Sequence, residues 1–500
     1  MSEQQKDTVK QEPTIKVPER ADRLKKLEEL RAMGVEPYPF TYPVDTRAAQ
    51  VLADSEKYIA EAKPHALAGR IVSYRSHGKS AFINILDDTG KIQAYVRKDI
   101  VGDASYAAFK LYDIGDFVGI KGPAFKTHTG ETTIEAREIV LLSKSLLPLP
   151  EKFHGLHDTD TRYRKRYLDL IADPEVKQLF VKRTKFVKAL RDYLDESGFM
   201  EVETPVLERI PGGADAAPFI THHNALDIDL YLRISLELHL KRLIIGGYEK
   251  VYEVGRVFRN EGMSPQHLQE FTMMECYWAY ADYQQLMGFI ERMYCRMLEA
   301  VNGSLEVNYQ GEALSFKPPW PRLDYRQLMI QHAGIDLDAH PTLESLVPKL
   351  KEKGIEPDPK LGRGRLIDQL YKKLVRPKLT QPCFLIDHPL DISPLAKRQP
   401  GRPGYVQRFQ VLFAGAEVGN AFSELNDPLD QRTRFEEQAK LRERGDAEAQ
   451  MYDRDFVEAM EHGMPPCGGF GVGIDRFFAI VTNAETVRDV VFFPTMKPEN

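Results

Sequence analysis

A long segment near the middle of the chain alternates polar and apolar side chains. The segment VYEVGRVFRNEGMSPQHLQEFTMMECYWAY spans residues 251–280, and its period of two predicts two strands around a loop at 262–269. Arg259 and Glu261 are expected to share a face of the first strand. The second strand should group four residues on one face: Phe271, Met273, Glu275 and Tyr277. Buried charges need partners, so these faces predict a pocket, although each residue alone is compatible with an ordinary surface role.

Two later segments carry related patterns. In EVGNAFSELND, alternate positions place three residues on one side of a strand: Asn420, Phe422 and Glu424. In GGFGVGIDR, Gly471 and Gly473 are expected to bring backbone close to a bulky group, and Asp475-Arg476 leads into the apolar run FFAIV. This stretch fits neither a Walker loop nor a dinucleotide fingerprint, and alone it is also compatible with a plain turn.

Residues 65–145 differ from the rest of the chain in their residue pattern. Five short β-rich segments separated by Gly and Asp turns predict a small antiparallel barrel. A hairpin turn at 88–90 places Phe82 on the face opposite Ile83 and Ile85. An exposed aromatic ring beside Arg75 is a candidate for stacking on an unpaired base, and an aromatic plug at the barrel end is the alternative.

Changes in composition divide the chain into four predicted parts. These are an N-terminal tail and helical extension at 1–60, the barrel at 61–146, a Pro-rich and then basic linker at 147–172, and a large domain at 173–500 with a helical insertion around 320–385. Residues 1–16 are polar and are expected to be disordered. The mixture of strands and helices predicts an α+β fold.

Charge and cysteine usage exclude several classes of protein. The chain has 500 residues, 68 Lys and Arg against 74 Asp and Glu, and a net charge of −6, which excludes a uniformly basic nucleic-acid-coating protein. It contains no apolar run long enough for a membrane span, and its first residues lack the apolar core of a signal peptide. Four scattered cysteines without a CxxC pair favour reduced thiols, so we expect a cytoplasmic protein without a membrane partner.

In chain order, these segments resemble the signatures of the class II aminoacyl-tRNA synthetases, and most closely the bacterial-type lysyl-tRNA synthetases. GFMEVETPVL resembles the first signature, whose Pro205 lies at the dimer interface in the family; FRNEG with EFTMME resembles the second and GGFGVGIDRF the third. The stretch PFITHHNALDIDLYLRIS is similar to the lysine enzymes rather than to the related aspartate and asparagine enzymes. The resemblance covers roughly residues 65–500 and implies an OB-fold anticodon-binding domain followed by a class II catalytic domain, an antiparallel sheet flanked by helices.

The resemblance implies a homodimer that activates L-lysine with ATP and Mg²⁺ to lysyl-adenylate and transfers lysine to the 3′-terminal adenosine of tRNA(Lys). Arg259 and Arg476 would be the catalytic residues, gripping the α-phosphate and the γ-phosphate end, as arginine forks suit polyphosphate. The other implied ATP contacts are Glu261, His267, Phe271, Glu417 and Gly473. The implied lysine contacts are Gly213, Glu237, Glu275, Tyr277, Asn420, Phe422 and Glu424.

Within the lysine set, Glu424 with Tyr277 would meet the ε-ammonium, and Glu237 with Glu275 the α-ammonium. On the barrel, the implied anticodon contacts are Arg75, Phe82, Gln93 and Glu135. Two alternatives stay open at this point: a lysine-activating ligase that acts on a protein, and a non-catalytic RNA-binding paralogue.

The sequence departs from the family pattern at two places. The metal ligands implied by the resemblance are Glu417 and position 410, where Gln410 replaces the usual carboxylate and contributes an amide oxygen without charge. The loop SPQHLQEF stands where the common lysine enzymes carry an Arg-His-Asn-Pro-Glu run, so a phosphate contact and a polar contact are expected to be lost at Gln266 and Leu268, which affects the loop's contacts to ATP and to the acceptor end of tRNA.

Overall fold

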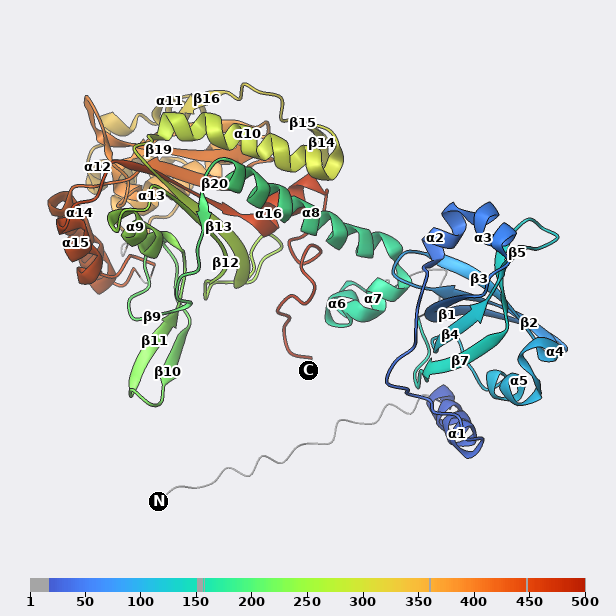
Figure 1. Ribbon diagram of the computed structural model, residues 1–500. Helices are drawn as coiled ribbons and strands as arrows, with labels where there is room; N and C mark the ends of the chain where they lie inside the picture. The colour runs from blue at the N-terminus through green and yellow to red at the C-terminus, as the bar shows by residue number, and fades with distance from the viewer. Residues whose placement is uncertain (1–17, 151–155, 157, 359–360, 447, 500) are drawn as a thin grey trace, which may run out of the picture. The chain divides into compact units, whose positions relative to one another are not determined.

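The computed structural model describes residues 18–150, 156, 158–358, 361–446 and 448–499. Contacts divide the chain into two compact units, Met1–Leu156 and His157–Asn500 (Figure 1). The expected disorder of residues 1–16 concerns a segment outside the described residues. The finer four-part division stays a prediction.

The N-terminal unit contains a seven-stranded sheet in the order β5-β6-β3-β2-β1-β4-β7 among its described residues. Its strands are β1 (His65–His77), β2 (Ser80–Leu86), β3 (Lys91–Arg97), β4 (Phe117–Gly122), β5 (Ala124–Lys126), β6 (Thr132–Ala136) and β7 (Glu138–Ser143). The prediction of five strands was wrong because two predicted segments each break once, at Pro123, which has no N–H to donate, and at Arg137.

Short helices flank this sheet: α1 (Pro18–Ala32), α2 (Ala48–Ala53), α3 (Ser55–Glu61), α4 (Lys98–Val101) and α5 (Asp103–Phe109). Strand β2 alternates as predicted, with Ile83 and Ile85 buried and Phe82 on the other face. The buried residues join Ile71, Val118 and Ile120 in one hydrophobic core.

The second unit is built on a larger sheet in the order β16-β17-β19-β20-β21-β13-β12-β8, with β18 paired to β19. Its strands are β8 (Met200–Glu201), β12 (Lys250–Phe258), β13 (Glu270–Ala279), β16 (Arg322–Asp324), β17 (Cys383–Pro389), β18 (Arg398–Gln399), β19 (Arg402–Phe413), β20 (Ala416–Ser423) and β21 (Cys467–Gly473). The central pairings are antiparallel, as expected, whereas β12 with β8 and β16 with β17 are parallel.

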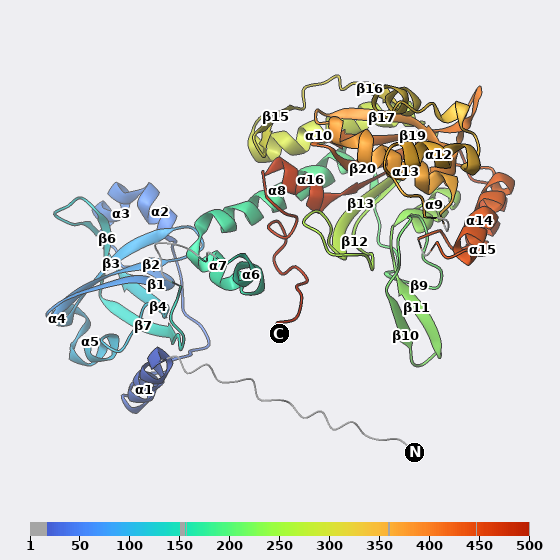
Figure 2. The ribbon, with the colours of Figure 1, turned by 180° about the vertical axis from the view of Figure 1, so that it is seen from behind.

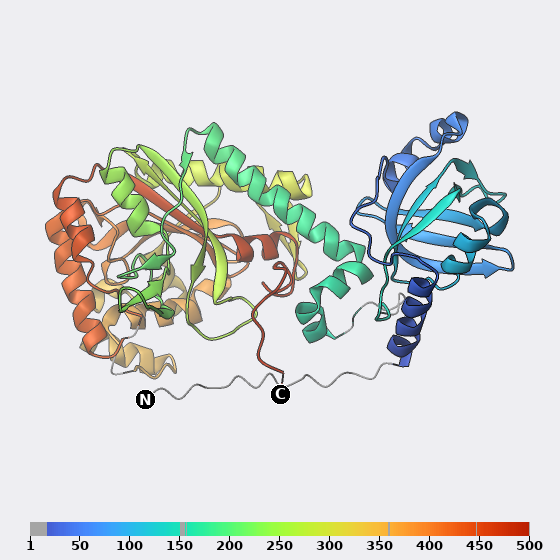
Figure 3. The same ribbon diagram turned by 60° about the horizontal axis from the view of Figure 1, so that its bottom comes forward.

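One face of this sheet packs against α8 (Pro174–Glu196), α10 (Tyr283–Asn302) and α16 (Ile474–Val481) (Figures 1 and 2). Helix α8 begins where the Asp173 side chain accepts a hydrogen bond from the Glu175 N–H, and it ends just before Gly198, whose φ of +80° suits a chain reversal. The other face packs against α9 (Glu237–Ile245), α14 (Pro428–Glu443) and α15 (Arg454–Glu461) (Figure 3).

Smaller elements complete the second unit. Two short helices, α6 (Thr159–Arg164) and α7 (Arg166–Ala172), form within the predicted linker, where Arg166 Nε donates to the Phe492 carbonyl at 3.1 Å. A projecting hairpin of β10 (Ile220–His223) and β11 (Ile228–Leu232) pairs with β9 (Leu207–Glu208), and β14 (Glu306–Tyr309) pairs with β15 (Glu312–Ser315). Between β16 and β19 lie α11 (Tyr325–Leu328), η1 (Met329–Ala333), η2 (Leu337–Ala339), α12 (Leu343–Glu352), α13 (Arg363–Leu374), η3 (Arg376–Lys378) and η4 (Leu390–Ile392). None of the helices among the described residues has the length and apolarity needed to span a membrane.

Candidate active site

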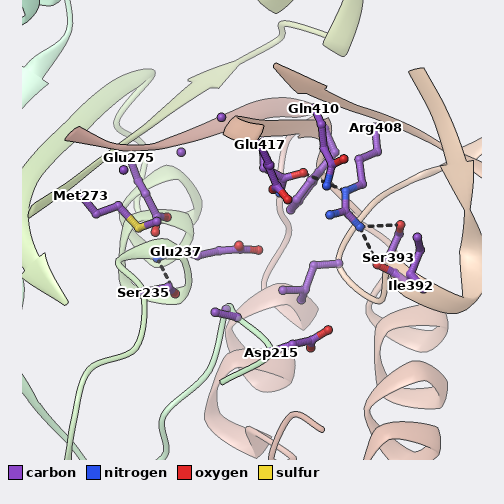
Figure 4. A pocket seen from close by; sticks show the side chains of 18 of the residues that line it. Asp215, Ser235, Glu237, Met273, Glu275, Ile392, Ser393, Arg408, Gln410 and Glu417 are labelled. Atoms are coloured by element: carbon purple, nitrogen blue, oxygen red, sulfur yellow. Dashed lines mark hydrogen bonds between the residues drawn. The ribbon is translucent and has the colours of Figure 1, made fainter. Parts of the chain in front are cut away.

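A cavity of about 490 Å³ opens on the sheet face opposite α8 and α10. Glu237 and Glu275 point toward a common space, and Glu417 and Gln410 lie beside each other across it (Figure 4). The cavity is lined by every residue that the sequence analysis assigned to ATP, lysine or metal: Gly213, Glu237, Arg259, Glu261, His267, Phe271, Glu275, Tyr277, Gln410, Glu417, Asn420, Phe422, Glu424, Gly473 and Arg476. Side chains from distant parts of the sequence therefore converge in one place.

The alternation of β13 explains this convergence. Met274 and Cys276 are buried in the core under α10, while Glu275 and Tyr277 line the cavity. Only part of the prediction for the preceding strand holds, because β12 ends at Phe258. Arg259 and Glu261 therefore lie in the loop after the strand rather than on its face.

The glycines of β21 make room on the cavity side. A Cβ atom at Gly469 would lie 2.1 Å from Glu424 Oε1, and one at Gly471 would lie 3.3 Å from Glu275 Cγ. At Gly473 a Cβ would meet nothing within 4 Å, so the backbone there borders open space. Phe470 and Val472, on the opposite face, fill the core. The glycine pattern thus permits close approach on one face only.

Glu275 lies at the acidic end of the cavity. Its Oε1 accepts a hydrogen bond from the Leu236 N–H and its Oε2 accepts one from the Tyr277 hydroxyl, both at 3.0 Å. Burial and the nearby charge of Glu237 raise the pKa of Glu275 to about 7. The carboxyl group therefore changes charge near neutral pH.

Glu237 and Glu424 are buried at the same end. The Lys241 ammonium, one helical turn after Glu237, lies 2.5 Å from Glu237 Oε1 and also forms an ion pair with Glu424 Oε2. Burial raises the pKa of both carboxyl groups, and the Lys241 charge opposes this shift. Among the described residues, Glu424 Oε1 has no hydrogen-bond partner. It is a buried acceptor that a cationic ligand can satisfy.

Backbone geometry shapes the wall beside Glu237. Gly213 has a φ of +82°, and a Cβ there would lie 2.1 Å from Ser235 Oγ. Ser235 Oγ donates to the Gly212 carbonyl at 2.9 Å. A side chain at position 213 would therefore be strained and would also clash with the wall.

Arg408 fixes the orientation of Asn420. Its Nε donates to Asn420 Oδ1 at 2.8 Å, while its Nη1 donates to the Ile392 carbonyl at 2.5 Å and to Ser393 Oγ at 3.0 Å (Figure 4). The Asn420 carbonyl is therefore occupied, which leaves its amide N–H groups for a ligand.

A second group of lining residues is rich in guanidinium groups, those of Arg259, Arg376 and Arg476, with Glu261 and Glu417 beside them. The Arg259 guanidinium lies 5.2 Å from the centre of the Phe271 ring, and its Nε donates to the Ile234 carbonyl at 3.2 Å. Arg476 Nη1 donates to the Glu417 carbonyl at 2.8 Å, and its buried Nε has no partner among the described residues. Two guanidinium groups held through backbone carbonyls keep their charge for an anionic ligand.

His267 lies beside these arginines. Desolvation and then the charges of Arg476 and Arg376 lower the pKa of His267 to about 4, so the imidazole is neutral at physiological pH. Its Nδ1 lies 2.7 Å from Ser264 Oγ. His267 can therefore offer a hydrogen bond to a ligand but no positive charge.

The two residues considered for a metal, Glu417 and Gln410, lie on the neighbouring strands β20 and β19. Gln410 is buried, and its Oε1 accepts a hydrogen bond from the Tyr371 hydroxyl at 3.4 Å. The described residues contain no cluster of three or more His, Cys, Asp or Glu side chains arranged to hold a metal ion. Both side chains have an oxygen atom that can bind a metal ion, but only Glu417 is a carboxylate.

On the barrel, three of the four predicted anticodon residues form one row across neighbouring strands. Arg75 of β1 pairs with Phe82 of β2, Phe82 pairs with Tyr95 of β3, and Tyr95 pairs with Glu135 of β6. The Phe82 and Tyr95 rings stack with centres 4.4 Å apart. Gln93 lies two residues before Tyr95 and donates from Nε2 to Glu131 at 2.9 Å. The row presents polar groups around a half-buried aromatic pair.

Comparison with known proteins identifies the family. Residues 158–497 match the family model of the class II tRNA synthetases (D, K and N), and residues 66–142 match the OB-fold nucleic acid binding domain. The chain belongs to the class II tRNA synthetases. The predicted α+β fold, an OB-fold domain followed by a class II catalytic domain, is confirmed.

Several curated relatives of this class II synthetase match along nearly their whole length. The lysine–tRNA ligase of Moorella thermoacetica is 51% identical over 96% of this chain and 98% of its own. That of Thermoanaerobacter pseudethanolicus is 51% identical over 96% of both chains, and that of Thermotoga maritima is 49% identical over 95% of both. The resemblance to bacterial lysyl-tRNA synthetases is confirmed.

Several residues around this synthetase cavity did not emerge from the sequence. Lys241 looks in the sequence like half of an ordinary i,i+4 surface pair, and Arg408 like a solvent-facing strand residue. Tyr371 and Arg376 belong to the predicted helical insertion, to which no chemistry was assigned. For Tyr95, the alternation that singled out Phe82 was available and would have placed it on the same barrel face.

Proposed function

We propose that this chain is a lysine–tRNA ligase that activates L-lysine with ATP and transfers it to tRNA(Lys). The observation that carries this function is the charge arrangement of one cavity. Glu237, Glu275 and Glu424 form one group of its lining residues, and Arg259 and Arg476 belong to a second group beside His267. A substrate with two ammonium groups beside a triphosphate matches both groups.

At the acidic end, Glu424 Oε1 receives the ε-ammonium of lysine, and Tyr277 closes that side of the site. Glu275 and Glu237 receive the α-ammonium. Asn420, held by Arg408, together with Phe422 and the Gly213 backbone, defines the remaining walls. A buried carboxylate left without a cation is costly, so this site rejects neutral isosteres of lysine.

In the group that contains the arginines, Phe271 stacks against the adenine, and Glu261, His267 and Gly473 contact ATP. A carboxylate oxygen of lysine attacks the α-phosphorus of ATP, a P–O bond forms, and the bond to the β-phosphate oxygen breaks to release pyrophosphate. Arg259 holds the α-phosphate and offsets the charge that develops there, while Arg476 holds the γ-phosphate end. The reaction requires positioning and electrostatics and no protein nucleophile.

In the second step, a ribose hydroxyl of the terminal adenosine attacks the carbonyl carbon of the adenylate, and AMP leaves. On the barrel, Arg75, Phe82, Gln93 and Glu135 bind the anticodon, with Phe82 stacked on a base. Stacking combined with hydrogen bonds to base edges is the usual way in which unpaired RNA bases are recognised.

Magnesium fits the pair Glu417 and Gln410 if most of its ligands come from ATP. Mg²⁺ commonly binds through one or two carboxylates together with substrate phosphate oxygens. Glu417 supplies the protein charge, and Gln410 can supply only a neutral oxygen, which Tyr371 already contacts. When bound, the ion shields phosphate charge.

We also propose a cytoplasmic homodimer. Exposed apolar side chains gather around the first signature segment, where Met200, Val206 and Leu207 are 41%, 40% and 47% exposed. A second copy of the chain would cover this surface around a two-fold axis. All four cysteines are free thiols, as is usual in a reducing compartment.

Lysine-dependent exchange of pyrophosphate into ATP, followed by charging of tRNA(Lys), tests the function. We expect exchange with lysine and none with aspartate or asparagine, because a site for these acids needs a cation where Glu424 lies. Exchange without tRNA charging would instead support a ligase that acts on a protein, and absence of exchange would support a non-catalytic paralogue.

A further inference from the structure

Lys241 lies behind the acidic wall of the cavity and is not among the residues that line it. It is fully buried on α9, and its ammonium contacts Glu237 and Glu424. The centres of the Phe422 and Phe456 rings lie 5.3 and 5.9 Å from its Nζ. A ligand in the cavity meets the two carboxylates first, so Lys241 acts on it only through them.

This placement differs from that of an ordinary i,i+4 pair. A surface pair contributes little, whereas a buried lysine carries a large desolvation cost that only well-placed anions offset. Lys241 joins two carboxylates from different elements, Glu237 at the start of α9 and Glu424 directly after β20. Its ammonium contacts Oε2 of Glu424. The buried Oε1 atom, which has no hydrogen-bond partner among the described residues, stays available to a ligand.

The charges at this end can be counted. Glu237, Glu275 and Glu424 supply three carboxylates, and Lys241 supplies one cation that belongs to the protein. The carboxyl groups outnumber this cation, so the acidic end favours a ligand that carries ammonium groups, as lysine does. We infer that Lys241 is a positioning residue for lysine specificity, which orients Glu424 and Glu237 and offsets part of their charge so that the ammonium groups of lysine complete the site.

Other ionisable groups also face this cluster: Glu275 and Tyr277 from β13, Arg408 from β19, Cys467 from β21, and Asp215 from the loop before β10. Arg408 is held by Asn420 and Ser393, and a further cation, Arg259, acts on Glu275. Without Lys241, burial would raise the pKa of Glu237 and Glu424 with less opposition. The carboxyl groups of Glu237 and Glu424 would then have to lose their protons when lysine binds.

The inference rests on the proposed function and is tested with Lys241→Met in pyrophosphate exchange. We expect the KM for lysine to rise roughly tenfold or more near neutral pH, and the pH profile of kcat/KM for lysine to shift upward by about one unit or more. The ratio of kcat/KM for lysine to kcat/KM for norleucine should fall. The KM for ATP should stay within about twofold of the parent value.

Arg242→Met is the matched control. Arg242 follows Lys241 on the same helix, and its Nη2 is paired with Asp453 at 2.8 Å, away from the cavity. Its loss should leave the KM for lysine and the pH profile unchanged. A Lys241→Met enzyme with the parent KM for lysine and the parent pH profile would overturn the inference, and so would equal losses for lysine and ATP.

If Lys241→Met does not fold, calorimetry of lysine binding to the unmodified enzyme decides the question. Titrations in buffers of different ionisation enthalpy, about one pH unit above neutrality, count the protons released. Release of at most one proton supports a cluster in which the Lys241 charge opposes protonation of Glu237 and Glu424, and release of two or more would overturn the inference. Absence of lysine-dependent exchange in the unmodified enzyme would instead refute the proposed function.

Discussion

At the scale of single residues, the cavity separates opposite charges. The carboxyl groups of Glu237, Glu275 and Glu424 form one group, and the guanidinium groups of Arg259 and Arg476 belong to another beside His267. Backbone carbonyls rather than carboxylates accept the hydrogen bonds of these arginines, which preserves their charge. An ammonium and a triphosphate can therefore bind side by side, each at the group with the opposite charge.

Replacing Glu424 with glutamine should remove the selection for the ε-ammonium. We expect kcat/KM for lysine in pyrophosphate exchange to fall by roughly a hundredfold, because a neutral amide replaces the carboxylate that faces the cation. Thermal unfolding should show an intact fold, since Lys241 keeps its contact with Glu237. Glu458→Gln, an exposed residue of α15, is the control. Activation of lysine at the parent rate would show that the specificity pocket is wrongly assigned.

The elevated pKa of Glu275 makes lysine binding depend on pH. Burial and the charge of Glu237 raise that pKa to about 7, and the bound ammonium favours the ionised carboxylate. Affinity for lysine should therefore be highest above about pH 7 and fall by roughly tenfold for each pH unit below it. Calorimetric titration with lysine measures this, and in Glu275→Gln the inflection near neutrality should disappear. If the affinity of that variant for lysine still changes near neutral pH, another group is responsible for the pH dependence.

At the scale of elements, the period of the strands separates core from site. In β13 and β21 one set of alternate side chains fills the core under α10, and the other set, or a glycine, faces the cavity. A shift of one residue in register would exchange the two faces, so the hydrophobic core itself fixes which groups reach the ligand. The barrel strands use the same rule, with Ile83 inside and Phe82 outside.

Phe82→Ala should separate the two steps of the reaction. We expect kcat/KM for tRNA charging to fall by about tenfold to a hundredfold, because stacking on a base contributes about 1–3 kcal/mol. Pyrophosphate exchange should stay at the parent rate. Phe117, another partly exposed aromatic residue of the barrel, provides the control variant Phe117→Ala. Equal losses in both reactions would indicate that Phe82 supports the fold.

At the scale of the whole molecule, the proposed catalytic site and the proposed anticodon contacts belong to different units. The large unit holds the cavity, and the barrel holds the aromatic row. The apolar surface around Val206 and Leu207 belongs to neither site. Exposed apolar groups at this density are typical of an interface with another chain.

The double variant Val206→Asp/Leu207→Asp should abolish the proposed homodimer. Charges placed in a two-fold interface meet their own copies, so both desolvation and repulsion oppose assembly. Light scattering coupled to size-exclusion chromatography should give the mass of a monomer for the variant and of a dimer for the parent. Leu429→Asp, at another exposed leucine, should remain dimeric. A monomeric parent protein would refute the proposal directly.

Local alternation along the chain is enough to predict which residues of β13, β20 and β21 share a face, where glycines leave room, and that Phe82 faces away from the barrel core. These follow from the fixed period of a strand, which is visible within a few residues. Alternation does not predict that Arg259 lies beyond its strand, that Arg408 holds Asn420, or that Lys241 joins Glu237 to Glu424. Those contacts link elements far apart in the chain, and the buried charge of Lys241 is stable only where the fold brings both carboxylates to it.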